Sequence, residues 1–588
     1  MDAAESIAIE TSGFGKLQVT NIWVDRSGRR HGLTQIDGGQ TFQILLLDDS
    51  VGVPHNETVV KLLDSVSVPP LETGVHDDLR YRIYSNFSGQ TLRKKLLEVA
   101  EGNDPTGGLE LVKMVAVPLC TLFARLHDRD LFFGDASPDW FVLNDDGTVA
   151  LNSTATPHGT HETLPLGETP IRVNKGFTAP EVYGRCMGTL GPASDVYFLG
   201  TIIYSLLAGI MPFGGTAHGV IRLPPLRAYQ DAIPPMVGAV AMRACSPYPI
   251  RRYRDAMAMR RALDTACESD RERDAFGIRT LEIDEGNEIH IGLVKALYSP
   301  VNQDQLFVGF DQLSSTGLFM VSDGVSISRY GSGDLASGCV RQAAAILWNQ
   351  VACQASALSP DDTLTLDTGG TMDVQSRFPD TPEGRRAALD GMLNHANVRI
   401  GQMVEPMLPS RPQPIESIMA ATAVAMMLDR NQATIGYIGD SRVYLIRDGH
   451  IAQLTVDHNL KTQLVRNGRA PAVARQAQGA NALVRCVGDF ERAPDYSLVA
   501  LPLSTEFMDL TILPGDSLVL CSDGVVDYAD FDEEGSEEMI RQIVEDAPTA
   551  SNAAFELMVA ANRGGGGDNI SCIVLQFTAL VQSAGVLG

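Results

Sequence analysis

The chain has 588 residues, a formal net charge of −26, and hydrophobic residues at 44% of its positions. This length exceeds what one hydrophobic core organises, so we expect two domains of roughly 250–300 residues each. The excess of carboxylates argues against nucleic acid or an anionic membrane as the main partner. Solubility accounts for most of this charge, and a metal site could account for the rest.

The cysteines and the apolar segments indicate a cellular compartment. The nine cysteines are scattered singly, without a Cys-x-x-Cys pair, which favours a reducing compartment over a disulfide framework. The acidic start MDAAESIAIE is no secretory signal. The longest apolar run, VYFLGTIIYSLLAGIMPF, includes Tyr197, Tyr204 and Ser205, which predicts a buried core helix instead of a membrane span. We therefore expect a cytoplasmic protein.

Five segments between residues 80 and 265 occur in the order of protein-kinase landmarks. They are RYRIYSNFSGQTLRKKLL, LCTLFARLHDRDLFFGDASPDWFVLNDDGTVAL, GFTAPEVYG, ASDVYFLGTIIYSLLAGIMPF and SPYPIRRYRDAMAMRRAL. In this order they resemble the hinge and its helix, the catalytic loop, the Ala-Pro-Glu segment, the buried helix that starts with Asp195, and an Arg, here Arg252, that pairs with Glu181. The resemblance implies a bilobal kinase-like domain over residues 1–265.

The residues that a kinase needs for catalysis are mostly replaced. Phosphoryl transfer requires side chains that neutralise phosphates and bind two metal ions. Asp135 stands at the catalytic-loop Asp position, but Trp140 replaces the metal-binding Asn and Ser137 replaces the Lys. The Asp-Phe-Gly position falls on residues 152–154, NST, and the strand FQILLLDD lacks its Lys. The segment SGFGKLQV is a weak glycine-loop match that could equally be a turn. We therefore predict a pseudokinase, and these replacements disfavour a working kinase.

A boundary is expected in the middle of the chain. Residues 262–289 are the most charged and least periodic stretch there. A helix-like pattern ends near Ala266, and strand-like alternation starts with IHIGLVKALY. We therefore predict a linker over residues 266–287 and a second domain over residues 288–588.

Aspartates in the second half follow or precede apolar runs that predict strands. The motifs are VNQDQLFVG, GLFMVSDGV, ATIGYIGDSR, GDSLVLCSDGV and GGGGDNISCIVLQF. A single Asp-Gly pair usually marks a turn. Five such motifs at strand ends instead indicate convergence on hard cations such as Mg²⁺ or Mn²⁺, which prefer oxygen ligands. The absence of Cys or His clusters disfavours zinc.

These motifs, in this order, resemble the PPM family of metal-dependent serine/threonine phosphatases, the type 2C class. The resemblance spans roughly residues 288–578 and implies two stacked β-sheets flanked by helices. The expected fold class is therefore α+β with two domains, a kinase-like fold followed by an α-β-β-α sandwich. The implied cofactors are two Mn²⁺ or Mg²⁺ ions, with a weaker third. A water activated by the two ions would attack phosphorus in line, without a protein nucleophile.

The resemblance also implies a role for each motif residue. Asp323 would bridge both metals, and the carbonyl of Gly324 would reach one of them. Asp304 would hold and orient the attacking water. Asp523 and Asp568 would complete the ligand shell of the other metal. Asp440, together with Asp523, would hold the third metal. Asp304, Asp323 and Asp523 are the expected catalytic residues.

Some positions depart from the family pattern. Gln303 replaces a Glu that many members carry, and Val325 and Ser326 follow Asp-Gly where animal relatives have a Gly pair and a His. The phosphate-gripping Arg falls on Ser299; the nearest basic residue is Lys295, and we identify no good substitute. Further along the chain, the pattern of residues 459–478 predicts a short helical flap beside the site.

Two readings of the whole chain stay open. The leading one is an active phosphatase with an N-terminal pseudokinase that regulates it or recruits substrate. Its partners would be a phosphorylated protein substrate and a cognate kinase or regulator bound by the pseudokinase. The alternative is a scaffold that binds phosphoproteins without catalysis. The scaffold reading needs a missing core carboxylate, whereas all of them are present in the sequence.

Overall fold

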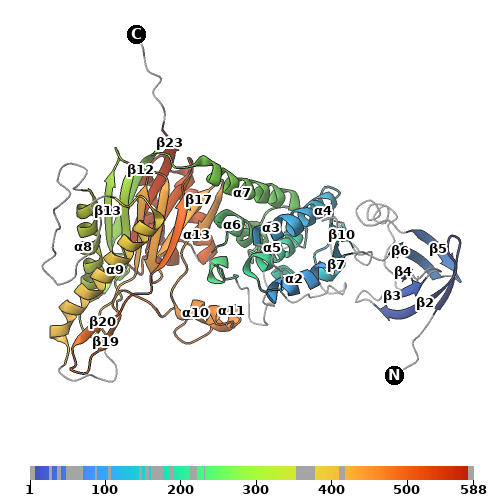
Figure 1. Cartoon of the computed structure of the whole chain (residues 1–588), viewed down its shortest axis with the longest axis horizontal. Coiled ribbons are helices and arrows are strands. Elements are labelled where there is room, and N and C mark those ends of the chain that lie inside the picture. The colour runs from blue at the N-terminus through green and yellow to red at the C-terminus, as the bar shows by residue number, and fades with distance from the viewer. Residues whose placement is uncertain are drawn as a thin grey trace, which may run out of the picture. The chain divides into compact units, whose positions relative to one another are not determined.

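The structure, a computed structural model, divides the chain into two compact units, residues 1–266 and 267–588. Each unit is described by itself (Figure 1). The described residues are 7–24, 30–35, 41–47, 71–77, 79–85, 89–103, 108–144, 149–151, 158–159, 176–183, 190–211, 222–230, 232–326, 328–352, 378–409, 417–530 and 532–580. Residues 152–154, expected at the Asp-Phe-Gly position, lie outside them.

Unit 1 begins with an antiparallel sheet in the order β1-β2-β3-β4-β6-β5. Its strands are β1 (Ile7–Thr11), β2 (Gly15–Val24), β3 (Arg30–Gln35), β4 (Thr41–Leu47), β5 (Glu72–His76) and β6 (Leu79–Ser85). The alternation of buried apolar and exposed polar residues explains β1 and the start of β2, because Ile9, Leu17 and Val19 are buried against Tyr81 and Ile83. The segment SGFGKLQV forms the turn between β1 and β2 and the first half of β2.

The rest of unit 1 is mainly helical. Its helices are α2 (Leu92–Ala100), α3 (Gly108–Leu111), α4 (Val117–His127), α5 (Pro192–Ala208), α6 (Pro235–Ala244) and α7 (Ala256–Phe276), with short strands β7 (Gln90–Thr91), β8 (Leu131–Phe132), β9 (Phe141–Leu143), β10 (Val149–Leu151) and β11 (His158–Gly159). Nearly every residue of α5 is buried, so the long apolar run is a core helix, as expected. Within the described ranges, no helix combines the length and apolarity needed to cross a membrane.

Two buried carboxylates organise the helical part of unit 1. Arg252 donates to both carboxylate oxygens of Glu181, at 2.7 and 2.8 Å, which confirms the predicted pair. Asp195 accepts from the backbone N–H groups of Phe133 and Gly134, at 2.8 and 2.7 Å. Both carboxylates therefore hold loops in place through buried, charge-assisted hydrogen bonds.

The loop that contains Asp135 is held by structural contacts. Trp140 lies edge-on against Phe133, with ring centroids 5.6 Å apart. Ser137 accepts from the backbone of Asp139 and caps a short 3₁₀ turn. Asp139 in turn pairs with Arg93 of α2 at 2.7 Å. At the two replaced positions, the side chains thus serve packing and capping.

The stretch expected to be a linker, residues 266–287, is largely regular structure. Helix α7 continues to Phe276, and strand β12 (Leu281–His290) starts seven residues before Glu288. Strand β12 lies at the edge of its sheet, with Leu281 and Ile283 buried and Glu282 and Asp284 exposed. An edge strand tolerates charge on its open side, which explains why this segment lacks an apolar pattern.

Unit 2 contains two five-stranded sheets. The first has the order β12-β23-β22-β17-β18 and the second the order β13-β14-β15-β16-β21, with neighbours antiparallel. The strands are β13 (Gln305–Asp311), β14 (Thr316–Ser322), β15 (Ala423–Asp429), β16 (Gln432–Ile438), β17 (Arg442–Arg447), β18 (His450–Gln453), β21 (Glu506–Thr511), β22 (Ser517–Cys521) and β23 (Ile570–Ala579); β19 (Phe490–Arg492) and β20 (Leu498–Ala500) form a separate hairpin.

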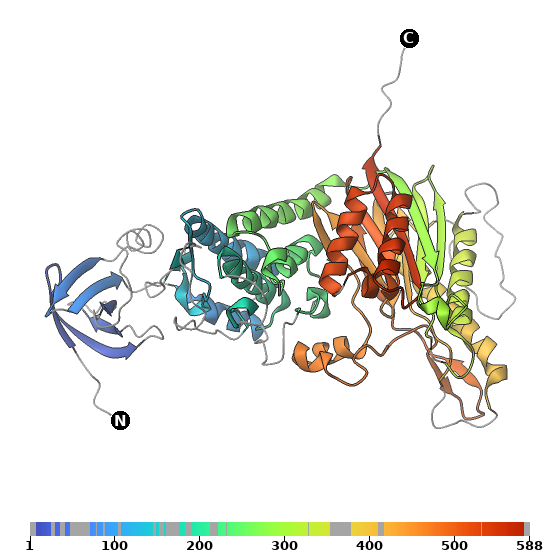
Figure 2. The ribbon, with the colours of Figure 1, turned by 180° about the vertical axis from the view of Figure 1, so that it is seen from behind.

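Helices cover the outer faces of the two sheets. Helices α8 (Gly333–Ala352) and α9 (Pro382–Val404) pack on the second sheet, and α12 (Asp523–Ala529), α13 (Glu533–Asp546) and α14 (Ala550–Arg563) pack beside the first. Figure 2 shows the red helices of the C-terminal region in front of the strands. Strand β14 contacts β22 and β23 across the sandwich. The C-terminal part is therefore a four-layer α-β-β-α sandwich, as expected.

Candidate functional site

Five aspartates lie at strand ends of unit 2. Asp304 directly precedes β13, and Asp323 directly follows β14. Asp440 stands between β16 and β17, and Asp523 is the first residue of α12 after β22. Asp568 lies two residues before β23. We call Asp304, Asp323, Asp440, Asp523 and Asp568 the carboxylate cluster.

The fold brings these five side chains within electrostatic reach of one another. Burial, reinforced by the negative charges of the other four, raises the pKa of Asp323 well above its usual range. Burial, together with the nearby Asp457, raises the pKa of Asp440 to about 7. Like charges held together in a poorly solvated site need a compensating positive charge.

Two carboxylate oxygens of the cluster are buried without a hydrogen-bond partner. Asp304 is fully buried; its Oδ2 accepts from Ser571 Oγ at 2.7 Å, while its Oδ1 has no partner. Burial raises the pKa of Asp304 to about 6. Asp523 Oδ1 is unpartnered in the same way. Such groups are rare in native proteins and commonly mark the place of an ion or water.

The donor set fits a hard divalent cation. It consists of carboxylates, and Mn²⁺ and Mg²⁺ prefer oxygen ligands. Within the described ranges, no group of three Asp, Glu, His or Cys side chains is placed so that it could hold a metal ion. Lys295 Nζ donates to Asp568 Oδ1. The ligand role of each residue stays a prediction.

Gly324 lies against backbone that leaves no room for a side chain. A Cβ at this position would lie 2.2 Å from the carbonyl oxygen of Gly333. The N–H of Gly324 donates to the carbonyl of Gln303, the residue before Asp304, at 3.1 Å. The glycine therefore brings the chain after Asp323 close to the chain before Asp304. The predicted role of its own carbonyl as a ligand is not tested by these contacts.

Lys295, the basic residue nearest to the position of the phosphate-gripping Arg, lies beside the carboxylate cluster. Lys295 Nζ donates to Asp568 Oδ1 at 2.5 Å and to Ser326 Oγ at 3.0 Å. The Lys295 side chain is 6% exposed. Although burial opposes its charge, the hydrogen bond to Asp568 raises its pKa. The charged ammonium thus lies at the edge of the cluster.

The sequence identifies Lys295 only as the nearest basic residue, because its neighbours come from distant segments. Asp568 lies 273 residues further along the chain. A local signal is Gly292, whose φ is +85° and whose Cβ would lie 2.2 Å from the carbonyl oxygen of Asp568. Asn569 also binds this region, since its Oδ1 accepts from Gln303 N and its Nδ2 donates to Ile291 O. Asn569 therefore ties the last loop to the chain around Ile291 and Gln303.

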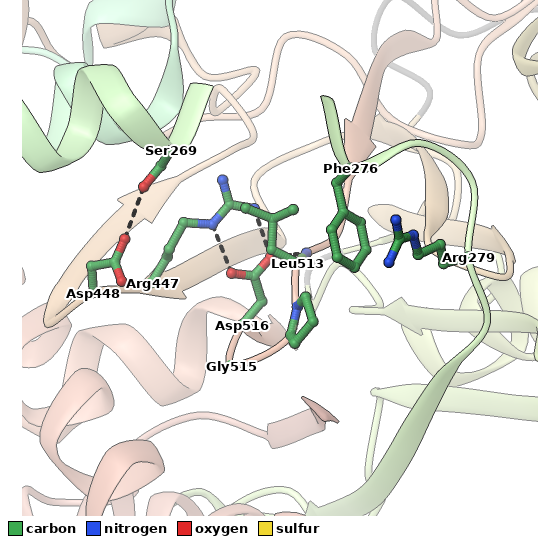
Figure 3. A pocket seen from close by; sticks show the side chains of 9 residues that line it. Ser269, Phe276, Arg279, Arg447, Asp448, Leu513, Gly515 and Asp516 are labelled. Atoms are coloured by element: carbon green, nitrogen blue, oxygen red, sulfur yellow. Dashed lines mark hydrogen bonds and ion pairs between the residues drawn. The ribbon is translucent and has the colours of Figure 1, made fainter. Parts of the chain in front are cut away.

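A cavity of about 440 Å³ lies elsewhere in unit 2 (Figure 3). Arg447 at its wall binds Asp516 through two hydrogen bonds of 2.7 and 2.6 Å. Asp448 follows Arg447 and accepts from Ser269 at 2.9 Å. These residues lie at the end of β17 opposite Asp440. The cavity is therefore separate from the carboxylate cluster.

Comparison with known proteins supplies a family for this site. Residues 371–570 match the family model of protein phosphatase 2C, a range that includes Asp440, Asp523 and Asp568. Residues 371–570 form a serine/threonine phosphatase domain of this type. The cofactor that this family uses is Mn²⁺ or Mg²⁺.

Two curated proteins share segments with this chain. The serine/threonine protein phosphatase PstP of Mycobacterium tuberculosis (strain ATCC 25618 / H37Rv) is 30% identical over 189 residues, 32% of this chain and 32% of PstP. The serine/threonine-protein kinase PknL of the same strain is 27% identical over 217 residues, 36% of this chain and 53% of PknL. The chain therefore spans about a third of PstP and about half of PknL.

A solved structure is also similar. The crystal structure of the catalytic domain of PstP in complex with two manganese ions is 25% identical, with a TM-score of 0.34. The similarity covers 51% of this chain and 100% of that one.

The flap of the phosphatase domain consists of two short helices. They are α10 (Leu460–Arg466) and α11 (Pro471–Arg475), which confirms the predicted helical character. Arg466 and Arg485 both donate to Glu506 Oε1, each at 2.7 Å. Glu506 on β21 therefore connects the end of α10, through Arg466, and the chain after the flap, through Arg485, to the sheet.

His458 connects the flap to the loop of Asp440. Its ring stacks on Tyr437, and its Nδ1 accepts from the N–H of Gly439 at 3.1 Å. Nε2 lies 3.2 Å from Glu506 Oε1. These contacts give His458 a structural role.

Removing the charge of Glu506 should weaken the flap in a pH-dependent way. Burial opposes ionisation, but His458 and Arg466 hold the pKa of Glu506 far below its ordinary value of 4.5. The depressed pKa means that its contribution is complete above about pH 4.5 and is lost below it. Glu506→Gln should lower the free energy of unfolding by about 1–3 kcal/mol at pH 7, as measured by urea unfolding.

The same measurement from pH 7 to pH 3.5 checks the direction of this effect. The difference from wild type should stay constant to about pH 5 and shrink below pH 4.5. Glu491→Gln, at an exposed position, serves as the matched control. A difference that grows as the pH falls would contradict the assignment.

Proposed function

We propose that the chain is a Mn²⁺- or Mg²⁺-dependent protein phosphatase that hydrolyses phosphoserine and phosphothreonine. The carboxylate cluster supports this proposal, above all the two unpartnered buried oxygens Asp304 Oδ1 and Asp523 Oδ1. The phosphatase 2C match over residues 371–570 agrees with it. The scaffold alternative is disfavoured because no carboxylate of the cluster is missing.

In this proposal the carboxylates divide into two tasks. Asp323, Asp523, Asp568 and the carbonyl of Gly324 hold the two ions, and Asp440 with Asp523 holds a third. Bound ions of this kind lower the pKa of a water and neutralise phosphate oxygens. Asp304 has Oδ2 fixed by Ser571, so Oδ1 is free to accept a hydrogen bond and orient the attacking water.

Lys295 binds the substrate phosphate in this arrangement. Ser326 accepts from Lys295 and donates to Gln303 Oε1 at 2.8 Å, so the ammonium is held on the side next to Asp568. A buried Lys with a raised pKa keeps its charge and attracts a phosphate dianion. The neutral Gln303 fits this task, since it orients Ser326 without adding negative charge.

No protein nucleophile takes part in the proposed reaction. Cys521 and Cys572 lie close to the cluster in sequence, but both are buried. Burial raises the pKa of Cys572 to about 12, so the thiolate is essentially absent at neutral pH. Direct attack by water therefore agrees with the residues present.

Unit 1 is proposed to be a catalytically inert kinase-like domain. The buried Glu181–Arg252 pair and the contacts of Asp195 support the kinase-like part. Trp140 and Ser137 have no role in binding nucleotide or metal, which supports the inert part. It would recruit the phosphoprotein or a cognate kinase, or act on the flap; two independent domains are the alternative. A cytoplasmic location without nucleic-acid or membrane partners completes the proposal.

Asp523→Asn should abolish the phosphatase reaction. The amide removes one negative charge from the proposed ion site, and we expect kcat/KM for a phosphothreonine peptide to fall about 100-fold or more. The rate is measured with excess Mn²⁺ and with a chelator. The exposed Asp495→Asn is the control. Full rate in Asp523→Asn, or no hydrolysis by the wild-type protein with Mn²⁺, would refute the assignment.

Lys295→Gln should weaken substrate binding instead of ion binding. Loss of one charge-assisted contact predicts a rise of about tenfold in KM for p-nitrophenyl phosphate. The Mn²⁺ concentration for half-maximal rate should not rise, because a cation beside Asp568 has been removed. Lys295→Arg should recover most of the affinity. An unchanged KM in Lys295→Gln argues against a phosphate contact.

Unit 1 should transfer no phosphate. The full chain carrying Asp523→Asn, in which self-dephosphorylation is blocked, is incubated with radiolabelled ATP and Mn²⁺ or Mg²⁺. No label should appear on the chain or on generic substrates, because the residues at the metal-binding positions are replaced. Stoichiometric labelling would show that unit 1 is a working kinase.

A further inference from the structure

An exposed apolar surface lies directly beside Lys295. The side chains of five residues share it, and we call it the apolar rim. They are Leu293 (60% exposed), Val294 (45%), Leu297 (82%), Tyr298 (67%) and Val301 (48%). Exposed apolar residues scattered singly are ordinary, but a contiguous group usually marks a binding surface. This group lies within nine residues of chain.

Hydrogen bonds fasten the apolar rim to the loop of Asp568. The N–H groups of Val294 and Lys295 both donate to the carbonyl of Gly566, at 2.9 and 3.0 Å. Tyr298 Oη donates to the carbonyl of Gly567 at 2.9 Å. Leu293 N donates to Asn562 Oδ1, also at 2.9 Å. The rim therefore holds a set position relative to the carboxylate cluster.

One 3₁₀ turn serves both the cluster and the rim. Within Lys295–Leu297, Lys295 is buried and bonded to Asp568, whereas Leu297 faces solvent. A 3₁₀ helix rises about 2 Å per residue, so the apolar side chains leave the backbone only a few ångströms from the backbone of Lys295. An extended peptide advances about 3.3 Å per residue. A side chain within about three residues of a phosphate at Lys295 can therefore reach the rim.

The extent of the rim favours a small occupant. A stable protein–protein interface takes about 20–30 residues from each side, whereas the rim offers five. A peptide side chain needs far less surface, and the rim belongs to the same short stretch of chain as Lys295. A second copy of this chain or a folded partner would need apolar surface beyond these residues.

We propose that the apolar rim binds an apolar side chain of the substrate protein, within about three residues of the phosphorylated Ser or Thr. This inference rests on the proposed phosphatase function. The rim would then select among phosphorylated sites by the residues that flank them, while Lys295 and the carboxylate cluster act on the phosphate common to all. Burial of an exposed Leu or Ile side chain against Leu297 and Tyr298 would supply the selectivity.

Two sets of synthetic phosphothreonine peptides test the proposal. They differ only in carrying Leu or Ser at each position from three residues before to three residues after phosphothreonine. We expect the best Leu peptide to exceed its Ser counterpart about five- to tenfold in kcat/KM and in affinity. Affinity is measured by fluorescence anisotropy of labelled peptides, which does not depend on turnover.

The double substitution Leu293→Ser and Leu297→Ser should reduce this preference to less than about twofold. Hydrolysis of p-nitrophenyl phosphate, which has no flanking residues, should stay unchanged and would show that the variant is folded. The matched control is Leu313→Ser, which removes a 97% exposed Leu in the turn between β13 and β14. The control should keep the wild-type preference.

The possible outcomes separate this inference from the proposed function. Equal use of Leu and Ser peptides by the wild-type protein, or a preference that survives the double substitution, would overturn the inference while leaving the phosphatase assignment intact. Absence of p-nitrophenyl phosphate hydrolysis would refute the assignment, and the anisotropy preference would still decide the role of the rim. A concentration-dependent dimer in light scattering that the double substitution abolishes would overturn the inference in favour of self-association.

Discussion

Repulsion among buried carboxylates is the constraint on which the phosphatase unit depends. Asp323 feels the charge of the four other aspartates of its cluster, and two oxygens nearby lack any partner. A fold tolerates such a site only if rigid strands keep the groups in place and positive charge compensates them. The strands that end at the cluster are almost wholly buried, and Lys295 supplies part of the compensation. Stability is thus given up locally for chemistry.

The sequence predicts the cluster well because each aspartate is marked by its own apolar strand. That signal is local, and it survives without knowledge of pairing. The contact of Lys295 with Asp568 cannot be read from the sequence, because it joins segments 273 residues apart that the pairing of β12 with β23 brings together. The stretch predicted as a linker, residues 266–287, contains the end of α7 and most of β12. Local chemistry is therefore easier to predict than contacts that depend on strand order.

Unit 1 shows that some of its side chains are fixed by the core and others are not. The Glu181–Arg252 pair is buried and bidentate, so loss of either partner would leave an unpaired charge in the core. The side chains at positions 137 and 140 carry no such penalty, because Ser137 caps a 3₁₀ turn and Trp140 packs against Phe133. Carboxylates that hold the core together and residues that would bind nucleotide are subject to separate physical requirements.

The pairing of β12 with β23 also bears on how such an enzyme can diversify. The ten residue pairs end with His290 opposite Ile570, and Lys295 follows within one short turn. Residues 298–302, beyond this turn, lead to Asp304 without entering a strand. Insertions or substitutions there change the outward surface while the ammonium keeps its place. Duplicated copies of such a gene could acquire new substrate proteins through substitutions in a few codons, while hydrolysis itself stays unchanged.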